Sequence, residues 1–509
     1  MEPLVLSGEG LTVRGVAEAA SREREVRIDP DARGRMERSR ALVERAIAEK
    51  RVVYGVDTGF GDLAEVSIGG EDLAALQVNL IRSHAAGIGP PLDERATRAI
   101  LLAKANSLLK GYDGVRFEIP VMLVAFLERG LLPVIPSIGS VGASGDLAPL
   151  AHLSLPLIGE GEVWWEGERI PASDGLRRAG IPALELGPKE GLGLVNGTQG
   201  MSGILALAAD AMENVIEHAV IAAALSTDAL RGTDDAFDAL LFRVRPHPGG
   251  AEVAARLRAL LRGSAIRESH RGVPKTQDAY SIRCAPVVVG AARDLLANVR
   301  RTVEAELNAA TGNPLCFADE NRILSGGNFH GEPVALAADF LAIAAAEVGS
   351  IAERRVARLV DSKLSGLSPF LARNPGLHSG YMVAQYTAAA LVSENKVLAH
   401  PASVDSIPTS GNQEDHVSMG FHAARKAREV VENVKRIVAI ELLAAAQGIE
   451  FLRPLRTSEA LEAAIAAIRS AVPSLEEDRP VGPDIERIVQ LIDEGTMRGR
   501  VRRALPTEG

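Results

Sequence analysis

The strongest constraint on the fold comes from four long segments that have the apolar spacing of helices. They cover residues 201–230, 286–310, 332–361 and 423–447. Gly448 is expected to end the last of these helices. Helices of this length that are apolar on more than one face need neighbours on several sides, so we predict a helix bundle that subunits can share. The last segment places six residues on one helical face: Ala427, Val430, Val431, Val434, Ile437 and Val438.

The first two hundred residues have a more mixed pattern. The predicted fold is therefore mainly α: a long-helix bundle with a smaller mixed N-terminal domain. We predict an N-terminal domain over residues 1–200, and a long-helix bundle with C-terminal helices over 201–509. The expected N-terminal elements are strands at 4–6, 11–13 and 26–28, helices at 30–50, 71–88, 93–110 and 115–129, and a hairpin at 161–171.

Composition excludes several classes of protein. The net charge is −10 over 509 residues with both signs interspersed, so we expect no nucleic-acid partner. The longest apolar stretches, such as 334–346, are short and are broken by Asp339, so we expect no membrane span. No basic region precedes a long apolar run at the start, which argues against a signal peptide. The two cysteines, Cys284 and Cys316, fit a reducing compartment, and we expect a cytoplasmic protein.

The stretch GSVGASGDLAPLAH, from Gly139 to His152, gathers small residues directly ahead of a helix. Its plainest interpretation is a glycine-rich turn in which Ser144 or Asp146 is the N-cap of that helix. A second interpretation is an anion-binding loop of backbone N–H groups, although the Lys-Ser/Thr of a P-loop does not follow.

A third interpretation of this stretch is chemical. In a tight turn the Gly145 nitrogen can attack the Ala143 carbonyl carbon, because Gly145 has no side chain and Ala143 has only a methyl group. Loss of water then closes a five-membered imidazolone ring. Loss of the Ser144 hydroxyl as a second water leaves an exocyclic methylene. The chain would then carry an electrophile made from itself.

Six further stretches carry residues that could act in catalysis or binding, and each also has a plain structural interpretation. The aromatic residues can be core residues, the histidine can end a helix, Asn-Gly suits a turn, and the acidic pair suits a solvated face. An arginine with its planar guanidinium can instead hold a carboxylate. The stretches are VYGVDTGFG with Tyr54, IRSHAAGIG with Ser83 and His84, GLGLVNGTQG with Asn196, TQDAYSIRC with Gln277, Tyr280 and Arg283, SGGNFHGEP with Phe329, and SGNQEDHVSMG with Glu414.

Together these stretches resemble the signatures of the aromatic amino acid ammonia-lyase family, from YGVDTGFG to RPVGPDI. In that family the Ala-Ser-Gly tripeptide becomes 4-methylidene-imidazol-5-one. The resemblance implies this prosthetic group at Ala143, Ser144 and Gly145, with no external cofactor. It also implies a homotetramer in which three chains build each active site.

The resemblance implies a role for each matching residue. Tyr54 is expected to remove the β-proton of the substrate, with Glu414 and Tyr280 as rival bases. Arg283 is expected to hold the substrate carboxylate, and His84 to face the substrate ring. The residues expected to support the electrophile and the substrate are Asn196, Gln277, Tyr280 and Phe329.

Glu414 and His84 decide the expected substrate. An imidazole N–H needs an acceptor and a carboxylate stabilises a cationic ring, whereas a phenyl ring gains nothing from a buried charge. We therefore expect an ammonia-lyase that converts L-histidine to trans-urocanate and ammonia. The alternatives are a tyrosine or phenylalanine ammonia-lyase, a 2,3-aminomutase, and a helical scaffold without activity. We expect no metal site, because HExxH is absent.

Three positions depart from the family pattern. Asp57 and His378 stand where asparagine is commoner, and Gly411 stands where alanine is commoner. None of them removes a catalytic group, so loop rigidity and the fit of the substrate are the properties that they affect.

Overall fold

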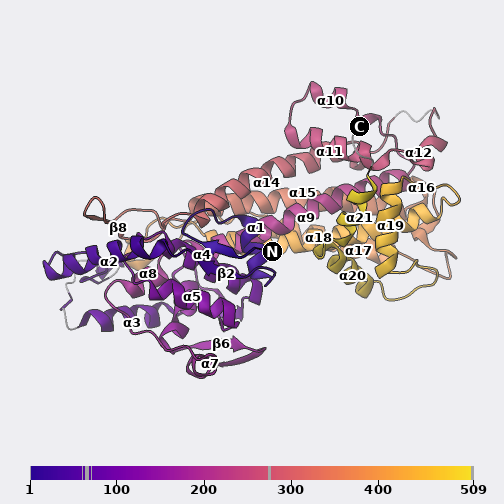
Figure 1. The fold of residues 1–509 in the computed structure, drawn as a ribbon. Coiled ribbons are helices and arrows are strands. Elements are labelled where there is room, and N and C mark those ends of the chain that lie inside the picture. Colours follow the sequence, from indigo (N-terminus) through magenta and orange to yellow (C-terminus); the bar gives the residue numbers. More distant parts are fainter. Residues whose placement is uncertain (1, 60, 64–67, 70–71, 273–276, 506–509) are drawn as a thin grey trace. The chain divides into compact units, whose positions relative to one another are not determined.

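The computed structural model describes residues 2–59, 61–63, 68–69, 72–272 and 277–505, and most of them are helical (Figure 1). The predicted mainly α fold is confirmed. Contacts divide the chain into two compact units of three segments each. The first unit is Met1–Asp210, Val299–Asp339 and Pro401–Lys426, and the second is Ala211–Asn298, Phe340–His400 and Ala427–Gly509. The domain division at residue 200 stays a prediction.

All the strands among the described residues lie in the first unit. The strand β1 (Leu4–Leu6) pairs in parallel with β2 (Val26–Ile28), whereas β3 (Ile88–Pro91) with β5 (Pro136–Ile138) and β8 (Leu315–Phe317) with β9 (Arg322–Leu324) are antiparallel. The predicted hairpin is β6 (Glu162–Trp165) and β7 (Glu168–Pro171), joined at its edge by β4 (Leu132–Pro133). The helices are α1 (Val13–Ala20), α2 (Ala32–Ala48), α3 (Leu73–His84), α4 (Glu94–Leu109), α5 (Glu118–Arg129), α6 (Leu147–Ser154), α7 (Ala172–Ala179) and α8 (Glu190–Val195).

The four long segments are helices, and each contributes residues to both units. They are α9 (Gln199–Ala229), α14 (Ala285–Leu307), α15 (Glu332–Val360) and α18 (Gly420–Glu450). The shorter helices of the second unit are α10 (Ala239–Arg243), α11 (Pro248–Leu261), α12 (Ala265–Ser269), α13 (Tyr280–Arg283), α16 (Ser362–Ser365), α17 (Met382–Leu398), α19 (Glu459–Ala471), α20 (Gly482–Asp493) and α21 (Thr496–Ala504).

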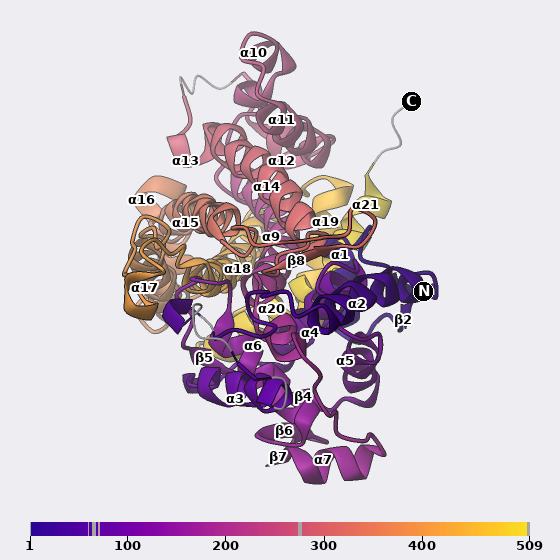
Figure 2. The ribbon, with the colours of Figure 1, turned by 90° about the vertical axis from the view of Figure 1, so that its left-hand side faces the viewer.

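A buried polar cluster joins three of the long helices inside the second unit. Arg355 of α15 and Glu441 of α18 form a two-pronged ion pair, with Nε–Oε1 and Nη2–Oε2 distances of 2.6 and 2.9 Å, and both side chains are fully buried. Ser226 of α9 donates to the same carboxylate at 2.6 Å. Figure 2 views the three helices nearly end-on, as neighbours in cross-section. A buried charge is tolerated when it is paired and hydrogen-bonded, so this cluster fixes how the three helices align.

Two local predictions are wrong. Residues 11–13 form no strand, because Thr12 is the N-cap of α1 and its side chain accepts a hydrogen bond from the Gly15 nitrogen at 3.0 Å. Gly448 does not end its helix, and α18 continues to Glu450. A Cβ at Gly448 would lie 3.2 Å from the Ala229 Cβ, so this glycine serves close helix packing in the second unit.

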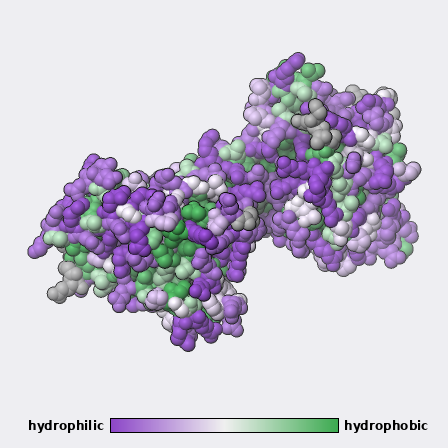
Figure 3. Space-filling model, in the orientation of Figure 1, coloured by the Kyte–Doolittle hydropathy of each residue, from purple (hydrophilic) through white to green (hydrophobic). Residues whose placement is uncertain are grey.

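The helix α15 extends well beyond the apolar stretch at residues 334–346. By length and composition one 18-residue window of it could cross a membrane, but 61% of that window is buried inside the structure. The core helix of a globular protein has the same composition, and hydrophilic side chains cover most of the face drawn in Figure 3. Burial therefore explains the apolar character of α15.

Candidate active site

The loop that carries Ala143, Ser144 and Gly145 is held in a tight turn in the first unit. Gly142 and Gly145 have φ values of 74° and 75°, in the left-handed region. Gly145 forms isolated bridges with both Gly142 and Gly197. A Cβ added to Gly145 would lie 2.0 Å from the Gly197 carbonyl oxygen. Only glycine fits at position 145, and this satisfies the steric requirement of the chemical interpretation.

Asp146 fixes the loop to the start of α9. It stands at the N-cap position of α6, but its side chain makes no capping hydrogen bond there. The buried carboxylate instead accepts from the Met201 nitrogen at 2.7 Å and from the Ser140 hydroxyl at 3.0 Å. Burial raises the pKa of Asp146 to about 7, against the opposing effect of these hydrogen bonds. The prediction that Asp146 stands at the N-cap position is thus correct, but its side chain does not cap the helix.

Ser144 lies among residues that the sequence analysis selected. Its carbonyl oxygen accepts from the Gly197 nitrogen at 3.2 Å and from the Asn196 side-chain nitrogen at 3.3 Å. Its hydroxyl donates to Glu414 Oε1 at 3.4 Å. The other Asn196 side-chain atom, Oδ1, is buried and has no hydrogen-bond partner among the described residues. An unsatisfied buried acceptor beside Ser144 is suited to a ligand.

Glu414 is oriented by its own loop. Thr409 donates to Glu414 Oε2 at 2.6 Å, and the two residues also form an isolated backbone bridge. The carboxylate acts electrostatically on His84, at the end of α3. Burial lowers the pKa of His84, while the negative charge of Glu414 partly opposes this effect. The Ser83 hydroxyl lies 3.1 Å from His84 Nδ1, within hydrogen-bond distance.

The loop of Tyr54 is anchored by a small apolar core. Val56 packs with Leu42 and Val43 of α2 and with Cys316 of β8. The Gly61 nitrogen donates to the Tyr54 hydroxyl oxygen at 3.1 Å. The short helical turn at Gly61–Leu63 contacts the turn at Ser410–Asn412, which ends two residues before Glu414. The loops of Tyr54 and Glu414 are therefore neighbours.

The departures from the family pattern have local structural roles. The Asp57 carboxylate accepts from the Val53 nitrogen at 2.7 Å and closes the Tyr54 loop. Gly411 has a φ of 61° inside the turn before Glu414, where a side chain would be strained. His378 Nδ1 accepts from the Asp478 nitrogen at 3.3 Å.

Phe329 is half-buried in the first unit, beside a pair of stacked histidines. The rings of His330 and His416 lie 5.4 Å apart at an interplanar angle of 23°. His416 is close to Glu414 in sequence, so this pair brings the Phe329 segment to the Glu414 loop.

The remaining predicted residues belong to the second unit. Tyr280 and Arg283 lie on α13, where the Arg283 guanidinium carbon is 5.0 Å from the centroid of the Tyr280 ring. Tyr280 is 72% exposed. Gln277 and Arg283 line a pocket of about 440 Å³ with Asp278. Eight predicted residues thus belong to the first unit, and Gln277, Tyr280 and Arg283 belong to the second.

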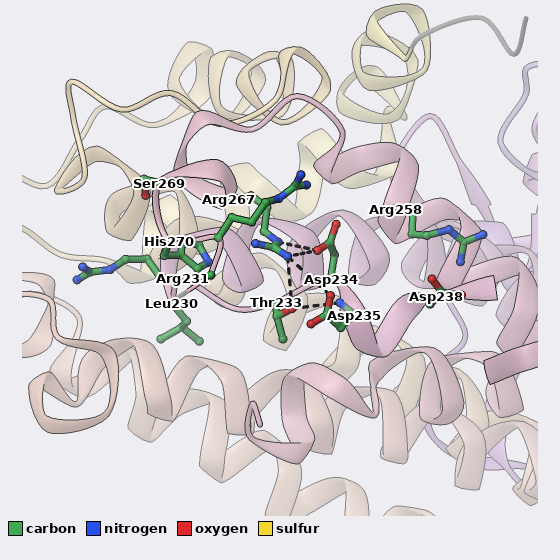
Figure 4. Close-up of a pocket in the computed structure, with 12 residues that line it drawn as sticks. Leu230, Arg231, Thr233, Asp234, Asp235, Asp238, Arg258, Arg267, Ser269 and His270 are labelled. Carbon is green, nitrogen blue, oxygen red and sulfur yellow. Dashed lines mark hydrogen bonds and ion pairs between the residues drawn. The ribbon is translucent and has the colours of Figure 1, made fainter. Parts of the chain in front are cut away.

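A larger cavity of about 800 Å³ in the second unit contains none of the predicted residues (Figure 4). Its lining is charged: Arg267 is paired there with Asp234, and Thr233, Arg258 and His270 lie around it.

Sequence reasoning missed three residues that shape the site. Thr409 and Gly197 act on Glu414 and Ser144 by the contacts above, and Gly197 acts through its backbone, which leaves little signal beyond the Asn-Gly pair. Lys104 is buried in α4, and its Nζ donates to the Asn196 carbonyl oxygen at 2.8 Å. A lysine inside the apolar run AILLAKANSLL was the available signal.

Comparison with known proteins identifies the group to which this architecture belongs. The model of the aromatic amino acid lyase family matches residues 11–470. The chain belongs to the aromatic amino acid lyase family. Members of this lyase family with curated names include a histidine ammonia-lyase of Symbiobacterium thermophilum, which is 51% identical over 490 residues, 96% of each chain.

Two solved structures of lyase-family members resemble the fold over nearly its full length. A histidine ammonia-lyase from Trypanosoma cruzi has a TM-score of 0.92 at 44% identity and covers 99% of this chain and 96% of its own. A tyrosine aminomutase from Streptomyces globisporus has a TM-score of 0.94 at 39% identity and covers 99% of each chain. The fold is therefore shared by members with different reactions, and the site must decide between them.

Proposed function

We propose that this protein is a carbon–nitrogen lyase that converts L-histidine to trans-urocanate and ammonia. Membership of the lyase family and similarity to relatives named histidine ammonia-lyase support the reaction class. One observation carries the choice of substrate: the Glu414 carboxylate lies 3.4 Å from the Ser144 hydroxyl, with its second oxygen held by Thr409. A fixed carboxylate at this place accepts from an imidazole N–H and stabilises a cationic ring.

We infer that Ala143, Ser144 and Gly145 form 4-methylidene-imidazol-5-one. The residues present fit this group, because Gly145 is tightly enclosed and the Ser144 carbonyl already accepts from two donors. Once formed, the group supplies an electrophilic carbon that bonds the substrate amine and turns it into a better leaving group.

The other side chains bind and orient the substrate in this proposal. Glu414 and His84 hold the imidazole ring, and the Arg283 guanidinium holds the carboxylate. Tyr54 removes the β-proton, and Glu414 and Tyr280 are the alternative bases. The Asn196 side chain and the Gly197 N–H stabilise negative charge on the Ser144 carbonyl oxygen, as the donors of an oxyanion hole do. Gln277, Tyr280 and Phe329 complete the contacts.

We also propose a homotetramer in which neighbouring chains complete each active site. Tyr280 is largely exposed in the single chain, which suits a residue that acts with another subunit. The second unit exposes large apolar side chains on two helices, Phe340 and Ile343 of α15 and Val383 and Tyr386 of α17. Apolar surface of this kind marks an interface. A cytoplasmic location is part of the proposal, since Cys284 and Cys316 are unpaired.

The test is near-ultraviolet absorbance of the purified protein mixed with L-histidine, L-tyrosine or L-phenylalanine. We expect a growing urocanate band with histidine, and none for Ser144→Ala, which cannot form the methylene. Glu414→Gln should raise KM for histidine about tenfold, because a charge-assisted hydrogen bond is lost. The control is the exposed neighbour Asp415→Asn. Product from tyrosine or phenylalanine without product from histidine would overturn the proposed substrate.

A further inference from the structure

Two lysines of the first unit, Lys104 and Lys189, are almost completely buried, and of these two Lys104 is the one that donates to Asn196, beside the active-site loop. Lys104 of α4 and Lys189 are 1% and 0% exposed. Lys189 donates to the Asp113 carbonyl oxygen at 2.8 Å. Lys104 donates to the Asn196 carbonyl oxygen at 2.8 Å, and its contact with the Gln199 side-chain oxygen is 3.4 Å long.

The Asn196 carbonyl belongs to the peptide group between Asn196 and Gly197, which is hydrogen-bonded to Ser144. The nitrogen of the same peptide group, on Gly197, donates to the Ser144 carbonyl oxygen at 3.2 Å. A continuous chain of hydrogen bonds therefore runs from the Lys104 ammonium, through one peptide group, to Ser144. A cation on the oxygen of an amide withdraws electrons from its N–H, and hydrogen bonds in such a chain strengthen one another in a buried environment.

The Ser144 carbonyl oxygen, which accepts the Gly197 hydrogen bond, is the atom on which negative charge develops during addition to the electrophile. Dehydration of Ser144 leaves a double bond between its Cα and Cβ, conjugated with its own carbonyl group. When a nucleophile bonds to Cβ, the electron pair of that double bond moves towards the Ser144 oxygen. A stronger donor at this oxygen therefore makes Cβ more electrophilic.

Lys104 is able to carry the necessary charge. Burial lowers its pKa to about 8, while the negative charge of Asp113 partly opposes this effect. At neutral pH the side chain is therefore still mainly an ammonium.

We propose that Lys104 is a positioning residue that tunes the reactivity of the Ser144-derived electrophile by polarising the Asn196–Gly197 peptide. Its hydrogen bonds go to Asn196 and Gln199, so it acts on the electrophile through the peptide group. The inference rests on the proposed function only in requiring that the electrophile forms.

The test separates electrophilicity from turnover of histidine. Cyanide adds to the electrophile by forming a bond between its carbon and the Ser144 Cβ, while the displaced electron pair takes a proton from water. The intact mass then rises by one HCN. Lys104→Met is compared with Lys189→Met, an equally buried lysine without contact to Asn196. Intact mass before cyanide reports whether two waters have been lost.

We expect Lys104→Met to lose two waters and then to add cyanide about tenfold more slowly than Lys189→Met, with kcat for histidine reduced and KM little changed. Lys104→Arg should recover most of the rate. Equal cyanide rates in the two methionine variants would overturn the proposal.

A second pair of variants decides the matter if Lys104→Met does not fold. Lys104→Arg keeps the charge, whereas Lys104→Gln keeps a donor without the charge, so only the arginine variant should react at nearly the wild-type rate. Equal rates in this pair would overturn the proposal. A wild-type protein that adds cyanide but does not deaminate histidine would refute the proposed function and leave the role of Lys104 intact.

Discussion

His218 should make the protein sensitive to mild acid. It is fully buried in α9 within the second unit, and its Nδ1 lies 2.8 Å from the Asn214 carbonyl oxygen. Its Nε2 has no hydrogen-bond partner among the described residues. Burial lowers the pKa of His218 from 6.5 to about 4. Protonation would place a cation with a single partner in an apolar interior.

The sign follows from where the proton binds. Between pH 6.5 and pH 4 the unfolded chain binds a proton at His218 that the folded chain does not, so the free energy of unfolding falls as the pH falls. The stability contributed by the depressed pKa is present above pH 6.5 and is lost on the way to pH 4. The full effect is about 3 kcal/mol, and between pH 7 and pH 5 it is about 2 kcal/mol.

The assay is urea unfolding of wild type, His218→Gln and His247→Gln at pH 7 and pH 5, with the free energy of unfolding expressed per chain. His247 is the matched control, because it is an exposed histidine of the same unit. We expect wild type and His247→Gln to lose about 2 kcal/mol more stability than His218→Gln on acidification. An identical loss in all three proteins would refute the assignment of this acid sensitivity to His218.

Two further substitutions test packing and pairing. Gly145→Ala should abolish both the loss of two waters and the enzymatic activity, because the new Cβ would lie 2.0 Å from a backbone oxygen. The control is Gly167→Ala, where no atom beyond the adjacent residues lies within 4 Å of the new Cβ, so dehydration and activity should be unchanged. Intact mass measures the dehydration and urocanate formation measures the activity. Dehydration of Gly145→Ala at the wild-type rate would contradict the steric argument. Glu441→Gln should lower the free energy of unfolding by about 3–5 kcal/mol, because the fully buried Arg355 would lose its charged partner. Urea unfolding measures this loss, and a change below about 1 kcal/mol would mean that Arg355 is compensated elsewhere.

Periodicity predicted the long helices well, since a 3.6-residue apolar repeat is a local property of the sequence. The 423–447 segment became α18, and 286–310 became α14. Gly448 failed as a helix end because its role is close contact with Ala229, a partner more than two hundred residues away. No local pattern contains that information.

The same distinction divides the candidate site. Residues with unusual side chains in recognisable motifs, such as Glu414 and Asn196, could be selected from sequence, and the structure brings them to Ser144. Thr409 and Lys104 could not be assigned, because their importance lies in the partner that each hydrogen-bonds. Asp146 was seen as a helix cap because local sequence reports position, whereas its hydrogen bonds go to the start of another helix.

The loop around Ser144 is built from parts of the chain that are synthesised at very different times. Besides Gly197, it is held by Met419, whose nitrogen donates to the Val141 carbonyl oxygen at 2.9 Å, and by Ser418, which donates to the Gly142 carbonyl oxygen at 3.4 Å. On the proposed chemistry, the reactive group therefore cannot mature on a nascent or truncated chain that lacks these residues. Because the loss of two waters is covalent, it would persist in any chain that has once folded. The fraction of chains whose intact mass is lower by two waters would therefore equal the fraction that has reached the native state.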